Sequence, residues 1–371
     1  MDLETLPNEI TTHIFTTLPT ISSVLALAST NHHFNTIYHG SQRLAILSAA
    51  ADAEYGPLND IIQICTYNAS QPAHTPRTVP MSDALIKEVL RIGKVAKQWE
   101  DVYPFKKWKD DYAARRLLSD GERYALRRAL YRLWHYTKAF HNRQHPRTTR
   151  NTPQLVAERA ALLHNYPTVE LAEMYDVQLV LRDVVANNIC PSNGRIRQKF
   201  QKRYPDSSHQ LLFNIHLNYP APASTWCSTA ADNAWLNPTL LQYSKSHHHH
   251  QPQSTPSNGF HNRLLPSRHH EPGAEGWGDD INHYYVVEDM MKLDPGQILL
   301  LKERYFLKGH VEAFVRLEVD GGEGWFVDNG ETFSETLWSV LRQRHMDDVD
   351  GGVEGLKREV EDGVLGVACG R

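Results

Sequence analysis

The histidines of this chain are its most obvious candidate metal ligands. Residues 247–250 are four consecutive histidines, and His261, His269 and His270 follow. Imidazole nitrogens bind zinc, copper and nickel, but no thiolate or carboxylate stands beside the run at 247–250 to complete a ligand set. The surrounding sequence is polar and low in complexity. We therefore predict no resident metal and no cofactor.

Residues 320–331 have the length and the acidic ends of an EF-hand calcium loop. The third and fifth places are Gly322 and Gly324, which have no side-chain oxygen, and the sixth is Trp325, where such a loop needs glycine. The segment therefore favours a hairpin turn over a calcium site.

The sequence contains no familiar motif for nucleophilic catalysis or phosphate binding. The chain contains no Gly-x-Ser-x-Gly, His-Glu-x-x-His, Gly-x-Gly-x-x-Gly or phosphate-loop sequence. A site built from scattered residues stays open, but nothing in the sequence supports one, so we predict a protein without catalytic residues.

Cysteine usage and hydropathy bound the location of the protein. The four cysteines, Cys65, Cys190, Cys227 and Cys369, lie too far apart for a metal or redox pair motif. No apolar run approaches the roughly 20 residues of a membrane span, and the first residues do not read as a secretory signal. These features predict a cytoplasmic or nuclear protein with reduced thiols and no membrane partner.

Charge is uneven along the chain, although the formal net charge is only −4. Residues 81–150 carry 17 Lys and Arg against 8 Asp and Glu, and residues 271–371 carry 10 against 22. Aromatic residues interleave the basic ones between 106 and 134, a pattern that can stack on bases and contact phosphates. We favour instead a helical bundle with an aromatic core and solvated arginines, so nucleic acid is not expected as a partner. Pairing with the acidic C-terminal part is a further alternative.

Helical periodicity dominates the middle of the chain. Apolar residues recur at helical spacing between Leu85 and Trp99, with Ser82 as a candidate cap, and Ser119 with Glu122 forms a capping box sequence. We predict a helical domain over residues 81–243. A helical connector with a Pro-rich linker precedes it at 46–80.

The C-terminal part predicts three further segments. Residues 244–275 are poor in apolar side chains and predict a disordered His/Pro/Ser-rich insert. Residues 276–345 predict a small α+β segment, in which Val311–Val319 pairs with 325–327 as a hairpin. Residues 346–371 predict an acidic flexible tail. The fold class predicted for the whole chain is mainly α.

Two short helices are predicted at the N-terminus. Leu6, Ile10, Ile14 and Leu18 recur every four residues and share a helical face, with Phe15 beside them. Pro7 suits a first helical turn, and Pro19 stops the helix. Ser22 or Ser23 can then cap a second helix with an apolar face.

This ordered set of residues, followed by an aromatic at position 34, resembles the F-box (cyclin-F-box-like) domain of fungal proteins over about residues 1–45. The resemblance implies a small helical module that docks on a Skp-type adaptor of a cullin ubiquitin ligase. It assigns docking and packing to Leu6, Pro7, Ile10, Ile14, Leu18, Pro19, Val24, Leu25, Leu27, Phe34 and Ile37.

The function implied by this resemblance is that of a substrate-recruiting subunit, whose remaining residues hold an unknown protein target. No internal repeat of 20–50 residues marks a leucine-rich, WD-type or kelch target-binding array. Two alternatives stay open: an F-box-like interaction scaffold without ligase activity, and a basic helical protein that associates with nucleic acid through residues 81–150.

Overall fold

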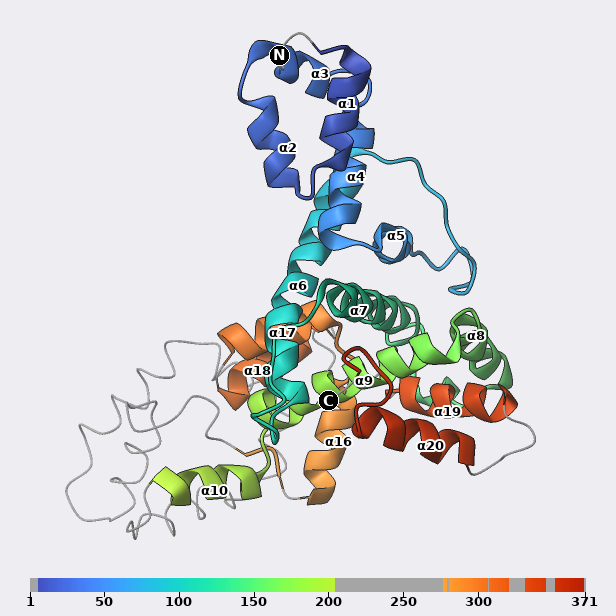
Figure 1. The fold of residues 1–371 in the computed structure, drawn as a ribbon. Coiled ribbons are helices and arrows are strands. Elements are labelled where there is room, and N and C mark those ends of the chain that lie inside the picture. Colours follow the sequence, from blue (N-terminus) through green and yellow to red (C-terminus); the bar gives the residue numbers. More distant parts are fainter. Residues whose placement is uncertain are drawn as a thin grey trace, which may run out of the picture. The chain divides into compact units, whose positions relative to one another are not determined.

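The computed structural model describes residues 6–203, 276–278, 280–305, 307–319, 331–344 and 351–369. Within these ranges the chain is mainly helical and no strand is formed, which confirms the predicted mainly α class (Figure 1). The chain divides into two compact units. Unit 1 comprises Met1–Val180, Asp294–Gly296 and Thr332–Arg371, and unit 2 comprises Leu181–Leu293 and Gln297–Glu331.

Unit 1 begins with three short helices that pack on a longer one. The short helices are α1 (Asn8–Thr17), α2 (Ile21–Ala28) and α3 (His32–Tyr38), and the longer one is α4 (Arg43–Tyr55). Helix α3 contacts both α1 and α2, and all three contact α4. Helix α4 also packs against α6, so the N-terminal helices join the rest of unit 1 through a shared core.

Three helices form the centre of unit 1: α5 (Leu58–Thr66), α6 (Asp83–Lys107) and α7 (Asp120–Phe140). They contact one another pairwise. Trp99 and Tyr131 are buried among them, and both polar groups are satisfied. The Trp99 Nε1–H donates to the Pro295 carbonyl at 3.1 Å, and the Tyr131 hydroxyl donates to the Tyr55 carbonyl at 2.8 Å.

The remaining helices of unit 1 come from distant parts of the sequence. The 3₁₀ turn Arg147–Thr149 leads to α8 (Pro153–His164) and α9 (Thr168–Val184). Helix α19 (Phe333–Arg344) packs against both α8 and α20 (Gly351–Glu361).

Unit 2 consists of short helices. Its elements, with the part of α17 that belongs to it, are η3 (Val185–Ile189), α10 (Asn193–Arg203), α16 (Asp280–Met290), α17 (Pro295–Arg304), α18 (Lys308–Phe314) and η5 (Val315–Val319). Helix α16 contacts η3, and α18 continues into the π-helical η5.

The predicted strand at Val311–Val319 is wrong, because these residues form α18 and η5. Val311, Phe314 and Val315 are buried at positions i, i+3 and i+4, which is a helical face. Its predicted hairpin partner at 325–327 and the insert at 244–275 lie outside the described residues.

The predicted flexible tail also differs from the structure. Helix α20 buries Val353, Leu356 and Val360, and the segment after it buries Val367 and Ala368. An acidic composition had suggested mobility, but the apolar residues of α20 recur at helical spacing and pack into unit 1.

Asp176 of α9 fixes this C-terminal segment from within unit 1. Its carboxylate, 2% exposed, accepts hydrogen bonds from the Tyr103 hydroxyl and from Lys107 Nζ at 2.7 Å. It also accepts the Val367 N–H at 3.0 Å. Gly366 has a φ of +117°, and a Cβ there would meet the Asp176 carboxylate, so glycine is required for this approach.

Arg77 organises the Pro-rich linker, which has no regular secondary structure. The residue is 8% exposed, and its guanidinium donates to the carbonyls of Asn68 and Gln71, each at 3.0 Å. Its backbone exchanges two hydrogen bonds with the Gln63 side chain, both at 2.9 Å. The guanidinium also lies 4.9 Å from the Tyr67 ring centroid.

Candidate functional site

The N-terminal helices are set by local caps. The Thr20 hydroxyl accepts the Ser23 N–H at 3.0 Å at the start of α2. The Asn31 side chain accepts the Phe34 N–H at 2.9 Å at the start of α3. Thr20 therefore takes the capping role that we predicted for Ser22 or Ser23, and Ser23 provides the capped N–H.

Two of the predicted site residues lie in the core of these helices. Val24 and Phe34 are 0% and 5% exposed. Phe34 contacts Phe15 edge-on, with 6.4 Å between ring centroids, and Tyr38 lies 6.3 Å from Phe15. Phe15 is fully buried and is the centre of this cluster, although the sequence interpretation placed it only beside the predicted stripe. The sequence feature that could have indicated a buried Phe15 is its position next to Ile14 of the predicted apolar stripe.

Other predicted site residues face solvent. Ile10 on α1 and Leu25 on α2 are 48% and 47% exposed. Pro7 and Pro19 are also exposed, and five more residues of the set are partly exposed, namely Leu6, Ile14, Leu18, Leu27 and Ile37. The structure thus divides the set between core and surface. Ile10 and Leu25 offer the most uncovered apolar area for a partner.

Glu54 ties the N-terminal helices to the rest of unit 1. Its carboxylate accepts the Ile21 N–H at 3.0 Å and pairs with Lys97 Nζ of α6 at 3.2 Å. Burial alone would raise the pKa of this carboxyl, but hydrogen bonds from Ile21, Tyr55 and Lys97 lower it overall. The ionised form of Glu54 therefore connects α2, α4 and α6.

The basic region 81–150 is largely paired inside unit 1. Ion pairs join these cations to acidic residues of the same unit: Arg91–Glu88, Lys97–Glu54, Lys107–Asp176, Arg116–Glu122, Arg127–Glu100, Arg128–Glu173, Arg132–Asp60 and Arg150–Glu335. The prediction of solvated arginines is thus wrong for Arg127, Arg128 and Arg132, whose side chains are largely buried. It holds for Arg91, whose side chain is 60% exposed. The predicted aromatic core is confirmed for Tyr131 and Trp134, which are buried, whereas Tyr112 is 75% exposed.

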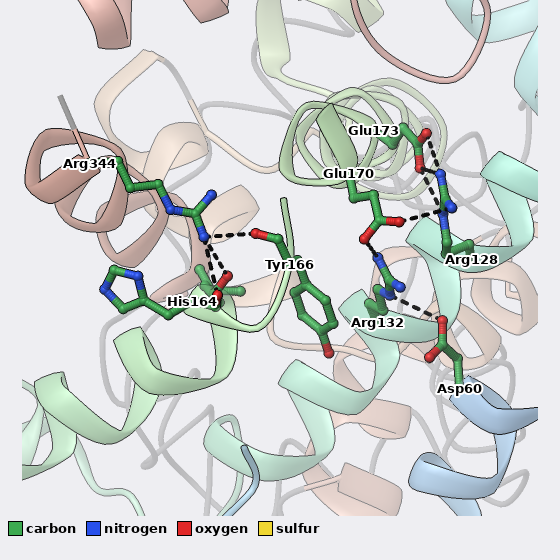
Figure 2. Close-up of polar contacts among 9 residues, drawn as sticks. Asp60, Arg128, Arg132, His164, Tyr166, Glu170, Glu173 and Arg344 are labelled. Carbon is green, nitrogen blue, oxygen red and sulfur yellow. Dashed lines mark hydrogen bonds and ion pairs between the residues drawn. The ribbon is translucent and has the colours of Figure 1, made fainter. Parts of the chain in front are cut away.

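Figure 2 shows the densest part of this network, between α5, α7 and α9. Glu170 bridges Arg128 at 2.9 Å and Arg132 at 2.6 Å. Arg132 also reaches Asp60 at 3.1 Å, and the second carboxylate on α9, Glu173, lies 2.6 Å from Arg128. Burial raises the pKa of Asp60, and Arg132 partly opposes that shift.

The same view shows how α19 is held near the α8–α9 turn. Arg344 donates to the carbonyls of Tyr166 at 2.7 Å and His164 at 3.3 Å. The Tyr166 ring lies 4.2 Å from the Arg132 guanidinium. The carboxylates and guanidiniums of this network face one another, so we interpret it as a structural joint. One sequence feature could have indicated this network, namely the i,i+4 spacing of Arg128 and Arg132 on a helix face.

Two cysteines in the described part are poor nucleophiles. Burial raises the pKa of the Cys65 thiol to about 11 and that of Cys190 well above its usual value, which disfavours the nucleophilic thiolate. No group of three or more His, Cys, Asp or Glu is placed to hold a metal among the described residues. The histidines at 247–250, with His261, His269 and His270, lie outside those residues, as does the loop at 320–330.

Comparison of the chain with protein-family models, curated proteins and solved structures finds no match. Within the described ranges, no helix combines the length and apolar character that crossing a bilayer requires. A functional assignment therefore depends on the residues and contacts described above.

Proposed function

We propose that this chain is a non-catalytic, substrate-recruiting subunit of a Skp/cullin/F-box ubiquitin ligase in the cytoplasm or nucleus. The observation that carries the proposal is the helical arrangement of the segment that resembles the F-box. Helices α1–α3 bury Phe15, Val24 and Phe34 and leave Ile10 and Leu25 exposed. This combination of a filled core and uncovered apolar side chains suits a docking module.

The mechanism in this proposal is proximity. The N-terminal helices bind the Skp-type adaptor, the rest of the chain binds a protein target, and other subunits transfer ubiquitin. Holding the target near the ligase raises its effective concentration and fixes its orientation. No catalytic residue of this chain is needed.

The alternative of nucleic-acid binding through residues 81–150 loses support, because most of its cations are engaged within unit 1, as in the Arg128–Glu173 and Arg132–Asp60 pairs. The scaffold alternative shares the same N-terminal helices and is separated from the ligase role by adaptor binding alone.

The test is the affinity of the full-length chain for a purified Skp-type adaptor, measured by biolayer interferometry. Burying a Leu or Ile side chain contributes about 1.5–3 kcal/mol, and about half of Ile10 and Leu25 is already covered. We therefore expect Ile10→Ala with Leu25→Ala to cost about 2 kcal/mol, or roughly 30-fold in Kd. The Leu6→Ala/Pro7→Ala variant should also weaken binding.

A matched control replaces two exposed apolar residues elsewhere in unit 1. Leu117 and Val169 are 80% and 57% exposed, and Leu117→Ala with Val169→Ala should bind the adaptor like the wild type. Equal weakening by both pairs would contradict the assigned surface. No binding of the wild type at micromolar adaptor would reject the ligase role and favour the scaffold.

A further inference from the structure

Helix α10 concentrates positive charge within eleven residues. Five of its eleven residues are cationic and none is acidic; the cations are Arg195, Arg197, Lys199, Lys202 and Arg203. Helices α17 and α18 of unit 2 mix the two signs: in α18, for example, Lys308 Nζ lies 4.0 Å from the Glu312 carboxylate. The field of α10 is therefore more strongly positive than that of its neighbours in sequence.

Three of these cations share one exposed face. Arg195, Lys199 and Lys202 are spaced i, i+4 and i+7, which places them along one side of the helix, and all three are exposed. With a rise of 1.5 Å per residue, Lys199 and Lys202 stand about 6 and 10 Å along the axis from Arg195. Among the ion pairs between described residues of unit 2, none involves these three side chains.

The first turn of α10 is fastened to another part of unit 2. The Asn193 N–H donates to the Gly278 carbonyl at 3.0 Å, and the Trp277 N–H donates to the Pro191 carbonyl at 3.0 Å. Trp277 is buried, and the Ser192 hydroxyl accepts the Arg195 N–H at 3.2 Å. The helix therefore presents its charged face from a fixed base, which reduces the ordering cost of binding.

We propose that the face formed by Arg195, Lys199 and Lys202 binds the phosphate backbone of a nucleic acid. A row of cations with no acid between them complements a polymer of regularly repeated negative charge, and displacement of its counterions drives such binding. The proposal is independent of the ligase role, since α10 lies outside the N-terminal helices.

Two other anionic surfaces fit α10 less well. A helix that lies on a lipid surface needs a free apolar face, whereas Ile196 is 5% exposed and faces the protein. An acidic protein partner usually contributes through apolar or aromatic anchors. Ile196 of α10 is not such an anchor, because its side chain is buried.

The test uses the full-length chain and fluorescence anisotropy with three labelled 20-mers: duplex DNA, duplex RNA and single-stranded RNA. Each titration is repeated between 50 and 200 mM NaCl. For three phosphate contacts on duplex DNA, log K should fall against log salt with a slope of about −3. Arg195→Gln, Lys199→Gln and Lys202→Gln together should weaken binding at least tenfold at 100 mM NaCl and flatten that slope. The comparison among the 20-mers shows which nucleic acid is preferred.

Helix α6 offers a control with the same spacing. Lys87, Arg91 and Lys94 are exposed at i, i+4 and i+7, but Arg91 pairs with Glu88 at 2.9 Å. Changing these three to Gln removes the same charge and should leave the affinity within about twofold of wild type. Circular dichroism confirms that each variant is folded.

Three results would overturn the proposal: no binding to any 20-mer at 50 mM NaCl, an α10 variant that binds like wild type, or equal losses in the α10 and α6 variants. Binding to phosphatidylserine vesicles is measured in parallel. Binding to vesicles without binding to the 20-mers would assign the face to lipid instead.

Discussion

Replacing Asp176 by Asn should destabilise unit 1 and release its C-terminal segment. The substitution keeps the shape of the side chain and one oxygen, which can still accept from the Tyr103 hydroxyl and the Val367 N–H. The amide group, however, must then face Lys107 Nζ, which now lies 2.7 Å from a carboxylate oxygen. A buried ammonium would lose its counter-ion and meet a second donor.

The magnitude follows from the burial of both partners. The side chains of Lys107 and Asp176 are 12% and 2% exposed. Removing one partner of a buried ion pair costs about 3–5 kcal/mol. Lys107 Nζ keeps its hydrogen bond to the Val360 carbonyl at 3.1 Å, so we expect a loss near the lower end, about 3 kcal/mol. For a unit of this size, that lowers Tm by roughly 6–12 °C.

Urea unfolding followed by circular dichroism measures the change, and limited proteolysis with mass spectrometry reports the release of residues 362–369. The variant Lys107→Met removes the cation, so the double variant should recover at least about 1 kcal/mol relative to the sum of the single changes. A loss below about 1 kcal/mol for Asp176→Asn, or strict additivity in the double variant, would refute the assigned ion pair.

Two further predictions concern unit 1. Burial, aided by Arg77 and Lys138, lowers the pKa of His135 from 6.5 to about 4. Between pH 6.5 and 4, His135 is protonated in the unfolded chain but neutral in the folded one. The free energy of unfolding should therefore fall by up to about 3 kcal/mol as the pH drops over this range. The difference between wild type and His135→Phe in urea titrations at pH 7 and 4.5 isolates this effect, and identical pH dependence in both would contradict it. Arg77→Ala should lower the free energy of unfolding by about 2 kcal/mol, because the carbonyls of Asn68 and Gln71 lose their donor. It should also make residues 68–76 accessible to cleavage by thermolysin. Arg77→Lys should not restore protection, since one ammonium cannot reproduce the guanidinium contacts.

Local signals in the sequence identified much of the helical structure. Ser82 caps α6 by accepting the Leu85 N–H at 3.2 Å, and Ser119 and Glu122 form the predicted capping box of α7. Leu85 and Trp99, the ends of the predicted stripe, are buried. These features depend on residues within one or two helical turns of each other. At that range, the spacing of apolar residues and the hydrogen-bonding capacity of the side chains are enough to predict the structure.

The errors arise where distant residues decide the outcome. Val311–Val319 contains both an alternating and a helical apolar pattern, and packing within unit 2 selects the helical one. The pairing of Arg132 with Asp60 joins residues 72 positions apart, so no local pattern reveals it. For the N-terminal site, the sequence identified the apolar residues but could not separate Phe34 in the core from Ile10 on the surface, because that division depends on how α3 packs on α1 and α2.

The contacts of Glu54 determine where the N-terminal helices can be separated from the rest of unit 1. Helix α4 is shared between α1–α3 on one side and α6 on the other, and Glu54 bonds to both neighbours. A fragment that ends at residue 45 would lack Ile46 and Ala50, whose side chains are fully buried in the whole chain, and would leave the faces of α1–α3 that pack on α4 uncovered. A protein bound to α1 and α2 would therefore be joined to α6 through continuous helix packing and not through a linker.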